Sequence, residues 1–111
     1  MTRPVAVTYL FSRECPSHDE GLVLLREAAA TAGVDVRVEA VEVRDDAQAE
    51  RLRFPGSPTY LVGGGDPFAP EGPAHAFRWD ACRAYRTPGG GVAPLPAREE
   101  LEAALAAEAA A

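Results

Sequence analysis

The sequence predicts an α/β domain in which helices flank a mixed four-stranded sheet, with a long loop inserted before the last strand. Strand-like and helix-like segments alternate up to residue 62, which is typical of β-α-β units. Tight glycine turns at 63–65 and 89–91 indicate that the later strands run antiparallel. The 111 residues, 47% of them hydrophobic, suffice for one core, so we assign residues 1–111 to a single domain.

The first β-α-β unit has the clearest pattern. Residues 5–11 (VAVTYLF) are apolar nearly throughout, which favours a strand buried on both faces. Pro16 suits the first position of a helix, and Gly33 suits its end. Valines alternate through 34–43, as in a second strand. A right-handed crossover makes these two strands parallel.

Shorter elements follow in the rest of the chain, and their boundaries come from turn-forming and capping residues. In order they are a short helix capped by Asp45 or Asp46, a strand at 59–62, a candidate fourth strand at 82–86, and a final helix opened by Pro96 with Leu101 and Leu105 on its inner face.

Composition and charge exclude two kinds of partner. The net charge is −6, and the eleven basic residues, all arginine, form no stripe, so we expect no nucleic acid partner. No apolar run approaches the roughly 18 residues of a spanning helix, so we expect no membrane partner.

Residues 5–11 lack the flanks of a signal peptide, so we expect a cytoplasmic protein. Its two cysteines are then expected to be reduced.

The segment 12–20 (SRECPSHDE) raises the main functional question, because Cys15 precedes a proline and His18 follows one turn later. A cysteine at a helix start lies near unpaired N–H groups and the positive end of the helix dipole, which stabilise the nucleophilic thiolate. A protonated His18 would add to this effect, and Asp19 and Glu20 would oppose it. The alternative is a structural thiol without reactivity.

The element order, with CPSH at 15–18 and SPT at 57–59, resembles the thioredoxin-like superfamily, and glutaredoxin-sized members are closest in length. The resemblance covers nearly the whole chain. It is strongest to small bacterial thioredoxin family proteins with a C-P-x-x start and a late C-R-x-Y stretch. It implies that Cys15 corresponds to the first cysteine of the C-x-x-C motif, and Pro58 to a cis-proline packed opposite it.

The resemblance also implies a substrate-binding surface, in which the backbone before the cis-proline pairs with an extended substrate. Its residues here would be Pro16, Ser57, Pro58 and Thr59.

The chain departs from the family at the second cysteine of the motif, which is His18, giving C-x-x-H. The resemblance then implies chemistry that uses one thiol, with Cys15 and His18 as the catalytic candidates. Cys15 would form a mixed disulfide with the substrate, and an outside thiol or Cys82 would resolve it. The simple fold places Cys82 far from Cys15, although the long segment 63–81 could reroute the chain and bring it close. A small buried hydrophobic role is the alternative for Cys82.

We therefore expect a monothiol disulfide oxidoreductase-like protein without a cofactor, acting on a disulfide-containing protein or a low-molecular-weight thiol. Two alternatives stay open: a non-catalytic adaptor that keeps the peptide groove, and a soft-metal (Zn, Cu or Hg) binding protein that adds Cys82 or His75 to the C-x-x-H pair. Two close ligands are too few to assign a metal site. Four residues of the long loop could also line a cleft with Cys15, although core or surface packing is the default role of each: Asp66, His75, Trp79 and Asp80.

Overall fold

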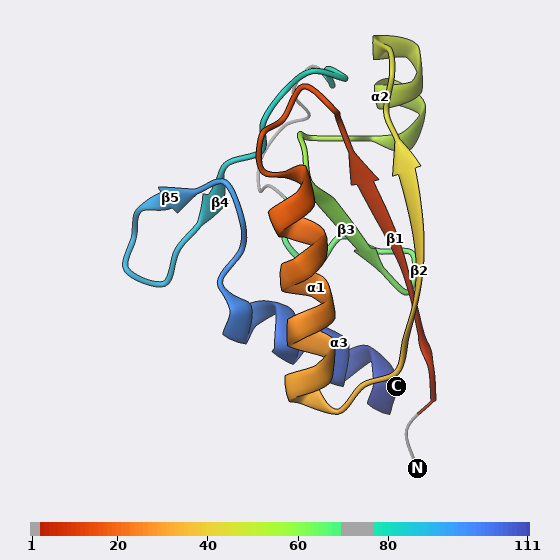
Figure 1. The fold of residues 1–111 in the computed structure, drawn as a ribbon, viewed down its shortest axis with the longest axis vertical. Coiled ribbons are helices and arrows are strands. Elements are labelled where there is room, and N and C mark those ends of the chain that lie inside the picture. The colour runs from red at the N-terminus through yellow and green to blue at the C-terminus, as the bar shows by residue number, and fades with distance from the viewer. Residues whose placement is uncertain (1–2, 70–76) are drawn as a thin grey trace.

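The computed structural model describes residues 3–69 and 77–111, where three helices accompany a mixed three-stranded sheet (Figure 1). The central strand is β1 (Val5–Phe11). β2 (Val36–Glu42) pairs with it in parallel, and β3 (Thr59–Val62) pairs with it antiparallel. The α/β class, the mixed sheet and the parallel first unit are thus confirmed.

The ends of the first two helices follow from their local sequence. α1 (His18–Ala32) ends at Gly33, whose φ of 69° is a left-handed conformation that glycine adopts easily. α2 (Asp46–Leu52) begins after Asp45, whose carboxylate accepts the Gln48 backbone N–H at 2.8 Å. That hydrogen bond satisfies one of the helix's unpaired N–H groups.

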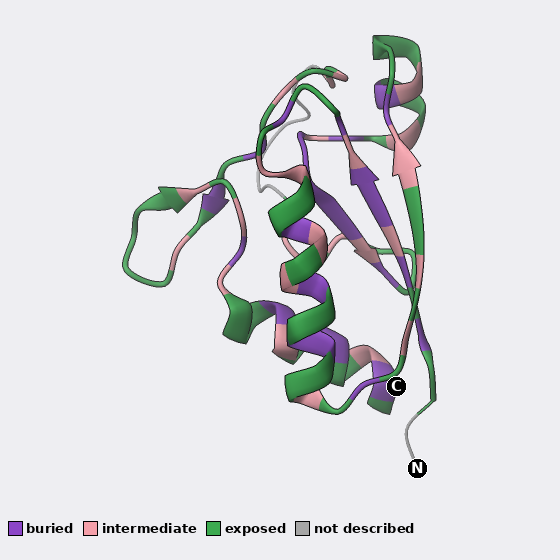
Figure 2. Ribbon diagram, in the orientation of Figure 1, coloured by how far each residue is buried: buried purple, intermediate pink, exposed green. Residues whose placement is uncertain are grey.

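Two apolar clusters pack against the sheet. The larger cluster joins the sheet to α1 and α3 (Arg98–Ala110) on the side of Tyr9, where Leu101 and Leu105 of α3 are fully buried, as predicted. The smaller cluster lies between Leu10 and α2. Neighbouring residues of a strand point to opposite faces, so the two clusters lie on opposite faces of β1. Figure 2 shows the buried residues along β1 and on the inner sides of the helices.

β1 is not buried on both faces along its whole length. Val5, Val7 and Tyr9 are buried on the α1 side, but on the opposite face Ala6 is exposed, and only Leu10 is fully covered. The reason is that α2 reaches only the carboxyl-terminal end of the strand (Figure 1).

The expected four-stranded sheet is wrong for the described part of the chain. β4 (Tyr85–Arg86) pairs antiparallel with β5 (Val92–Ala93) in a separate hairpin closed by the turn at 89–91. The reason lies just upstream, where Cys82 forms an isolated parallel bridge with Ser57. A chain that passes Ser57 in the parallel sense is not the expected antiparallel neighbour of β3, and after this bridge it continues into the β4–β5 hairpin.

Candidate functional site

Cys15 lies in the turn between β1 and α1. Its N–H donates to the Ser12 carbonyl at 3.1 Å, and its carbonyl accepts the His18 N–H at 3.3 Å. α1 begins at His18 and not at Pro16 as predicted, because Ser17 has φ −93° and ψ 4°, outside the helical range. Cys15 therefore precedes the first helical turn, whose leading N–H groups have no acceptor within the helix.

The Cys15 sulfur is fully buried against the loop that leads into β3. Its S–H donates to the Ser57 carbonyl at 3.4 Å. The Ser57–Pro58 peptide bond is cis, as predicted. The Ser57 hydroxyl accepts the Ser12 N–H at 2.9 Å and so ties the loop to the end of β1. These contacts hold the cysteine turn and the proline loop together.

Ser57 also pairs with the segment 81–83. Its N–H donates to the Ala81 carbonyl at 2.9 Å, and its carbonyl accepts the Arg83 N–H at 3.0 Å. Cys82 stands between these two bonds, opposite Ser57. The backbone groups expected to pair with an extended substrate are thus occupied by the chain's own segment.

Gly56 allows the two backbones to come this close. Its φ is 141°, and a Cβ built there would lie 2.7 Å from the Arg83 Cα and 2.9 Å from the Cys82 carbonyl carbon. Only glycine fits such a contact. No local sequence pattern indicates this contact.

Cys82 is the exposed cysteine of the pair. Although the residue is exposed overall, partial burial of its thiol raises its pKa, and the Cys15 thiol beside it raises the pKa further. The bridge places Cys82 beside Ser57, whose carbonyl accepts the Cys15 S–H, so both cysteines lie next to one peptide group. The structure thus brings together two cysteines that the simple fold would have separated.

The His18 imidazole contacts Asp19 and Phe11. Its Nδ1 lies 3.2 Å from the Asp19 carboxylate, and its ring stacks on Phe11 with centroids 5.4 Å apart. The Tyr9 hydroxyl donates to the His18 carbonyl from the sheet side. Within the described chain, no hydrogen bond joins the imidazole to Cys15.

Arg83 anchors the segment that carries Cys82. Its side chain is only 3% exposed and lies 2.8 Å from the Asp66 carboxylate. It also donates to the Thr59 hydroxyl at 3.3 Å and to the Phe68 carbonyl, and it lies over the Tyr85 ring at 4.4 Å. Sequence reasoning missed this role, since the only signal was an arginine within a strand candidate. Asp66, a cleft candidate, is its ion-pair partner.

Most of the predicted substrate-binding surface is covered. Ser57, Pro58 and Thr59 are buried, whereas Pro16 is exposed beside Cys15. The Tyr85 hydroxyl donates to the Pro58 carbonyl and covers the loop from outside. A large substrate would have to displace part of this cover.

The other loop candidates have packing or surface contacts. Trp79 packs against the smaller apolar cluster, and its backbone N–H donates to the Asp46 carboxylate at 3.1 Å. Asp80 pairs with Arg78 at 3.8 Å. His75 lies outside the described residues.

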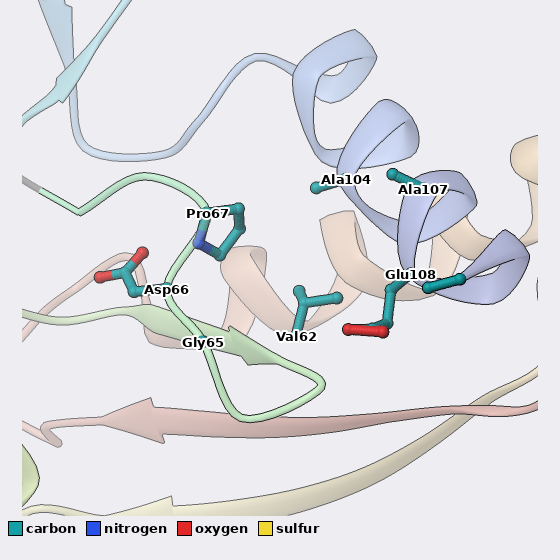
Figure 3. A pocket seen from close by; sticks show the side chains of 8 residues that line it. Val62, Gly65, Asp66, Pro67, Ala104, Ala107 and Glu108 are labelled. Atoms are coloured by element: carbon teal, nitrogen blue, oxygen red, sulfur yellow. The ribbon is translucent and has the colours of Figure 1, made fainter.

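A pocket of about 390 Å³ lies elsewhere, between the loop after β3 and α3 (Figure 3). Its two acidic residues are already paired, Asp66 with Arg83 and Glu108 with Arg3. Neither cysteine lines it. We therefore assign the candidate site to the cysteines and not to this pocket.

Within residues 3–69 and 77–111, no three His, Cys, Asp or Glu side chains are grouped so that they could hold a metal ion. No helix in the same ranges is long and apolar enough to cross a membrane. A scan of protein-family models and searches of curated proteins and of solved structures found no significant match. We therefore infer the function from the chemistry and geometry of the site.

Proposed function

We propose that this protein performs thiol–disulfide exchange at Cys15, as a thioredoxin-like oxidoreductase whose local motif contains a single cysteine. The observation that carries the proposal is the contact of the Cys15 sulfur with the Ser57 carbonyl at 3.4 Å, directly before cis-Pro58. The resemblance of the CPSH and SPT segments to that superfamily supports the same chemistry.

The reaction begins with a Cys15 thiolate, which attacks one sulfur of a disulfide R–S–S–R′. A bond forms between the Cys15 sulfur and R–S, the original S–S bond breaks, and R′–S⁻ leaves and takes up a proton. Cys15 lies in the turn directly before the start of α1, and the positive end of a helix dipole favours a thiolate. His18, the first residue of α1, joins this turn through its backbone, since its N–H donates to the Cys15 carbonyl at 3.3 Å.

The site favours a small disulfide over a protein substrate. Both backbone groups of Ser57 are bonded to residues 81–83. A substrate strand would have to break these two hydrogen bonds, and each contributes about 1 kcal/mol. A low-molecular-weight disulfide needs only a local opening beside Pro16 and Cys82, the exposed residues next to the buried sulfur.

The proposal is tested by measuring the reduction of hydroxyethyl disulfide with an external thiol as the electron donor. Wild-type protein is expected to accelerate the reaction, and Cys15→Ser is expected to return it to the uncatalysed rate. Thermal melting of both proteins shows whether the variant keeps its fold. A wild-type rate equal to the uncatalysed rate contradicts the proposal and favours the non-catalytic adaptor.

Soft-metal binding is a second candidate, and the position of Cys15 and Cys82 beside the same Ser57 peptide group favours it. Two thiolates suit soft ions such as Cu(I), whereas structural zinc needs four ligands. Titrating the reduced protein with Cu(I) tests this candidate. It predicts one tightly bound ion per chain, and no tight binding by Cys82→Ser.

A further inference from the structure

Three segments that are distant in sequence meet at one peptide group. The Ser57 carbonyl accepts the Cys15 S–H at 3.4 Å and the Arg83 N–H at 3.0 Å. The parallel bridge places Cys82 directly opposite Ser57. Cys15 and Cys82 are therefore both neighbours of Ser57, one through its sulfur and the other through its backbone.

We propose that Cys15 and Cys82 form a reversible intramolecular disulfide beside the Ser57 carbonyl, which makes the protein a dithiol enzyme although its C-x-x-H motif holds one cysteine. Cys82 then resolves the mixed disulfide on Cys15. His18, which replaces the second cysteine of the motif, has no thiol and cannot do so. This inference rests on the proposed function, because it supplies the second half of the same reaction.

Two features of the site suit a bond that forms and breaks. The segment 81–83 is held in register by its backbone bonds to Ser57 and by the buried Arg83–Asp66 ion pair, so Cys82 stays beside its partner. Cys82 is exposed while Cys15 is buried. An external thiol can thus reach the Cys82 sulfur of the disulfide and reduce it.

The reaction consists of two successive thiol–disulfide exchanges. Cys15 first forms a mixed disulfide with R–S and releases R′–S⁻. The Cys82 thiolate then attacks the Cys15 sulfur, the Cys15–Cys82 bond forms, and R–S⁻ leaves. The substrate disulfide gains two electrons and two protons, and the protein's two thiols lose them. An external thiol reductant returns both cysteines to the reduced state.

The raised pKa of the Cys82 thiol is consistent with this order. A thiol with a raised pKa is less ionised at neutral pH and so reacts more slowly with an external disulfide. Once the mixed disulfide has formed, Cys82 is already next to the sulfur it attacks, and this proximity offsets the low thiolate fraction.

Peptide mapping of the whole chain tests the inference directly. Trypsin cleaves after arginine, which puts Cys15 in peptide 14–26 and Cys82 in peptide 79–83. Reduced protein is treated with hydroxyethyl disulfide, quenched with acid, alkylated and digested without reductant. We expect the two peptides to be linked in monomeric wild-type protein. In Cys82→Ser we expect the mixed disulfide to accumulate on peptide 14–26.

Each other outcome overturns a defined part of the scheme. If wild-type protein accumulates the mixed disulfide on peptide 14–26 while Cys82 stays free, the pair is wrong and the proposed function stands. If peptides 14–26 and 79–83 are linked only in covalent dimers, the intramolecular pair is likewise wrong and the proposed function stands. If Cys15→Ser accumulates the mixed disulfide on peptide 79–83 and Cys82→Ser stays unmodified, Cys82 is not the resolving residue. If Cys15 stays free in both the wild-type protein and Cys82→Ser, the proposed function fails as well.

Discussion

Ser57 is the residue that organises the candidate site. Its hydroxyl accepts from Ser12, its N–H donates to Ala81, and its carbonyl accepts from both Cys15 and Arg83. Every polar group of the residue is used, and the residue is fully buried. The family resemblance placed Ser57 only in a substrate-binding surface beside Pro58. Its part in joining the two cysteines depends on pairing with a segment more than twenty residues away, which no local pattern reveals.

The pH dependence of Cys82 alkylation tests the contact between the thiols. Burial and the Cys15 thiol both raise the pKa of Cys82, so fewer Cys82 thiols are ionised at a given pH and alkylation slows. The alkylation midpoint of peptide 79–83 should therefore lie above that of a free cysteine. It should move down in Cys15→Ser, because one cause of the shift is removed. An unchanged midpoint in the variant would show that the thiols do not interact.

A Gly56→Ala variant tests the close approach of the two backbones. The added Cβ would lie 2.7 Å from the Arg83 Cα at a φ of 141°, so we expect a loss of about 1–3 kcal/mol in the free energy of unfolding. It should also separate the segment 81–83 from Ser57 and slow formation of the linked peptides.

Gly89→Ala is the matched control for Gly56→Ala. Nothing lies within 4 Å of a Cβ built at Gly89, so its stability should change by less than about 0.5 kcal/mol. Equal denaturation midpoints for the two variants would contradict the backbone contact.

At the level of elements, the segment 81–83 pairs with Ser57, which contacts the buried Cys15 sulfur, and Arg83 anchors this segment. The Arg83 side chain is 3% exposed and pairs with Asp66. Removing one partner of a buried ion pair costs about 3–5 kcal/mol. We expect Arg83→Ala to lose stability in this range and to raise the alkylation rate of Cys15, because its cover loosens. Chemical denaturation and mapping of peptide 14–26 measure the two effects.

Arg86→Ala provides the control for Arg83→Ala. Arg86 is exposed on β4, so its removal should leave stability within about 0.5 kcal/mol of wild type and Cys15 alkylation unchanged. If Arg83→Ala leaves Cys15 alkylation unchanged as well, the segment is not what shields the sulfur.

Local patterns predicted most elements but not the partner of the last strand candidate. The 59–62 strand, the Asp45 cap and the Gly33 helix end were read correctly because each depends on a few adjacent residues. The 82–86 segment has a β-favouring composition, but composition does not specify which strand it joins. The turn at 89–91 pairs it with β5, whereas we expected the sheet.

At the scale of the whole molecule, the path of the chain decides whether the cysteines meet. Sequence reasoning left two positions open for Cys82, far from Cys15 or beside it, because the course of the segment 63–81 is a long-range property. In the structure, Cys82 returns to the loop before Pro58. The site therefore combines one turn that was predictable, around Cys15, with one tertiary contact that was not.

A redox titration measures whether Cys15 exchanges with disulfides, which is the basis of the proposed function. The protein is equilibrated in glutathione buffers of increasing oxidised fraction, acid-quenched and alkylated, and the state of peptide 14–26 is measured. We expect Cys15 to pass from alkylated to disulfide-bonded in one transition within the range of the buffers. A Cys15 that remains reduced and alkylatable across the whole series would contradict the proposed function and identify Cys15 as a structural thiol.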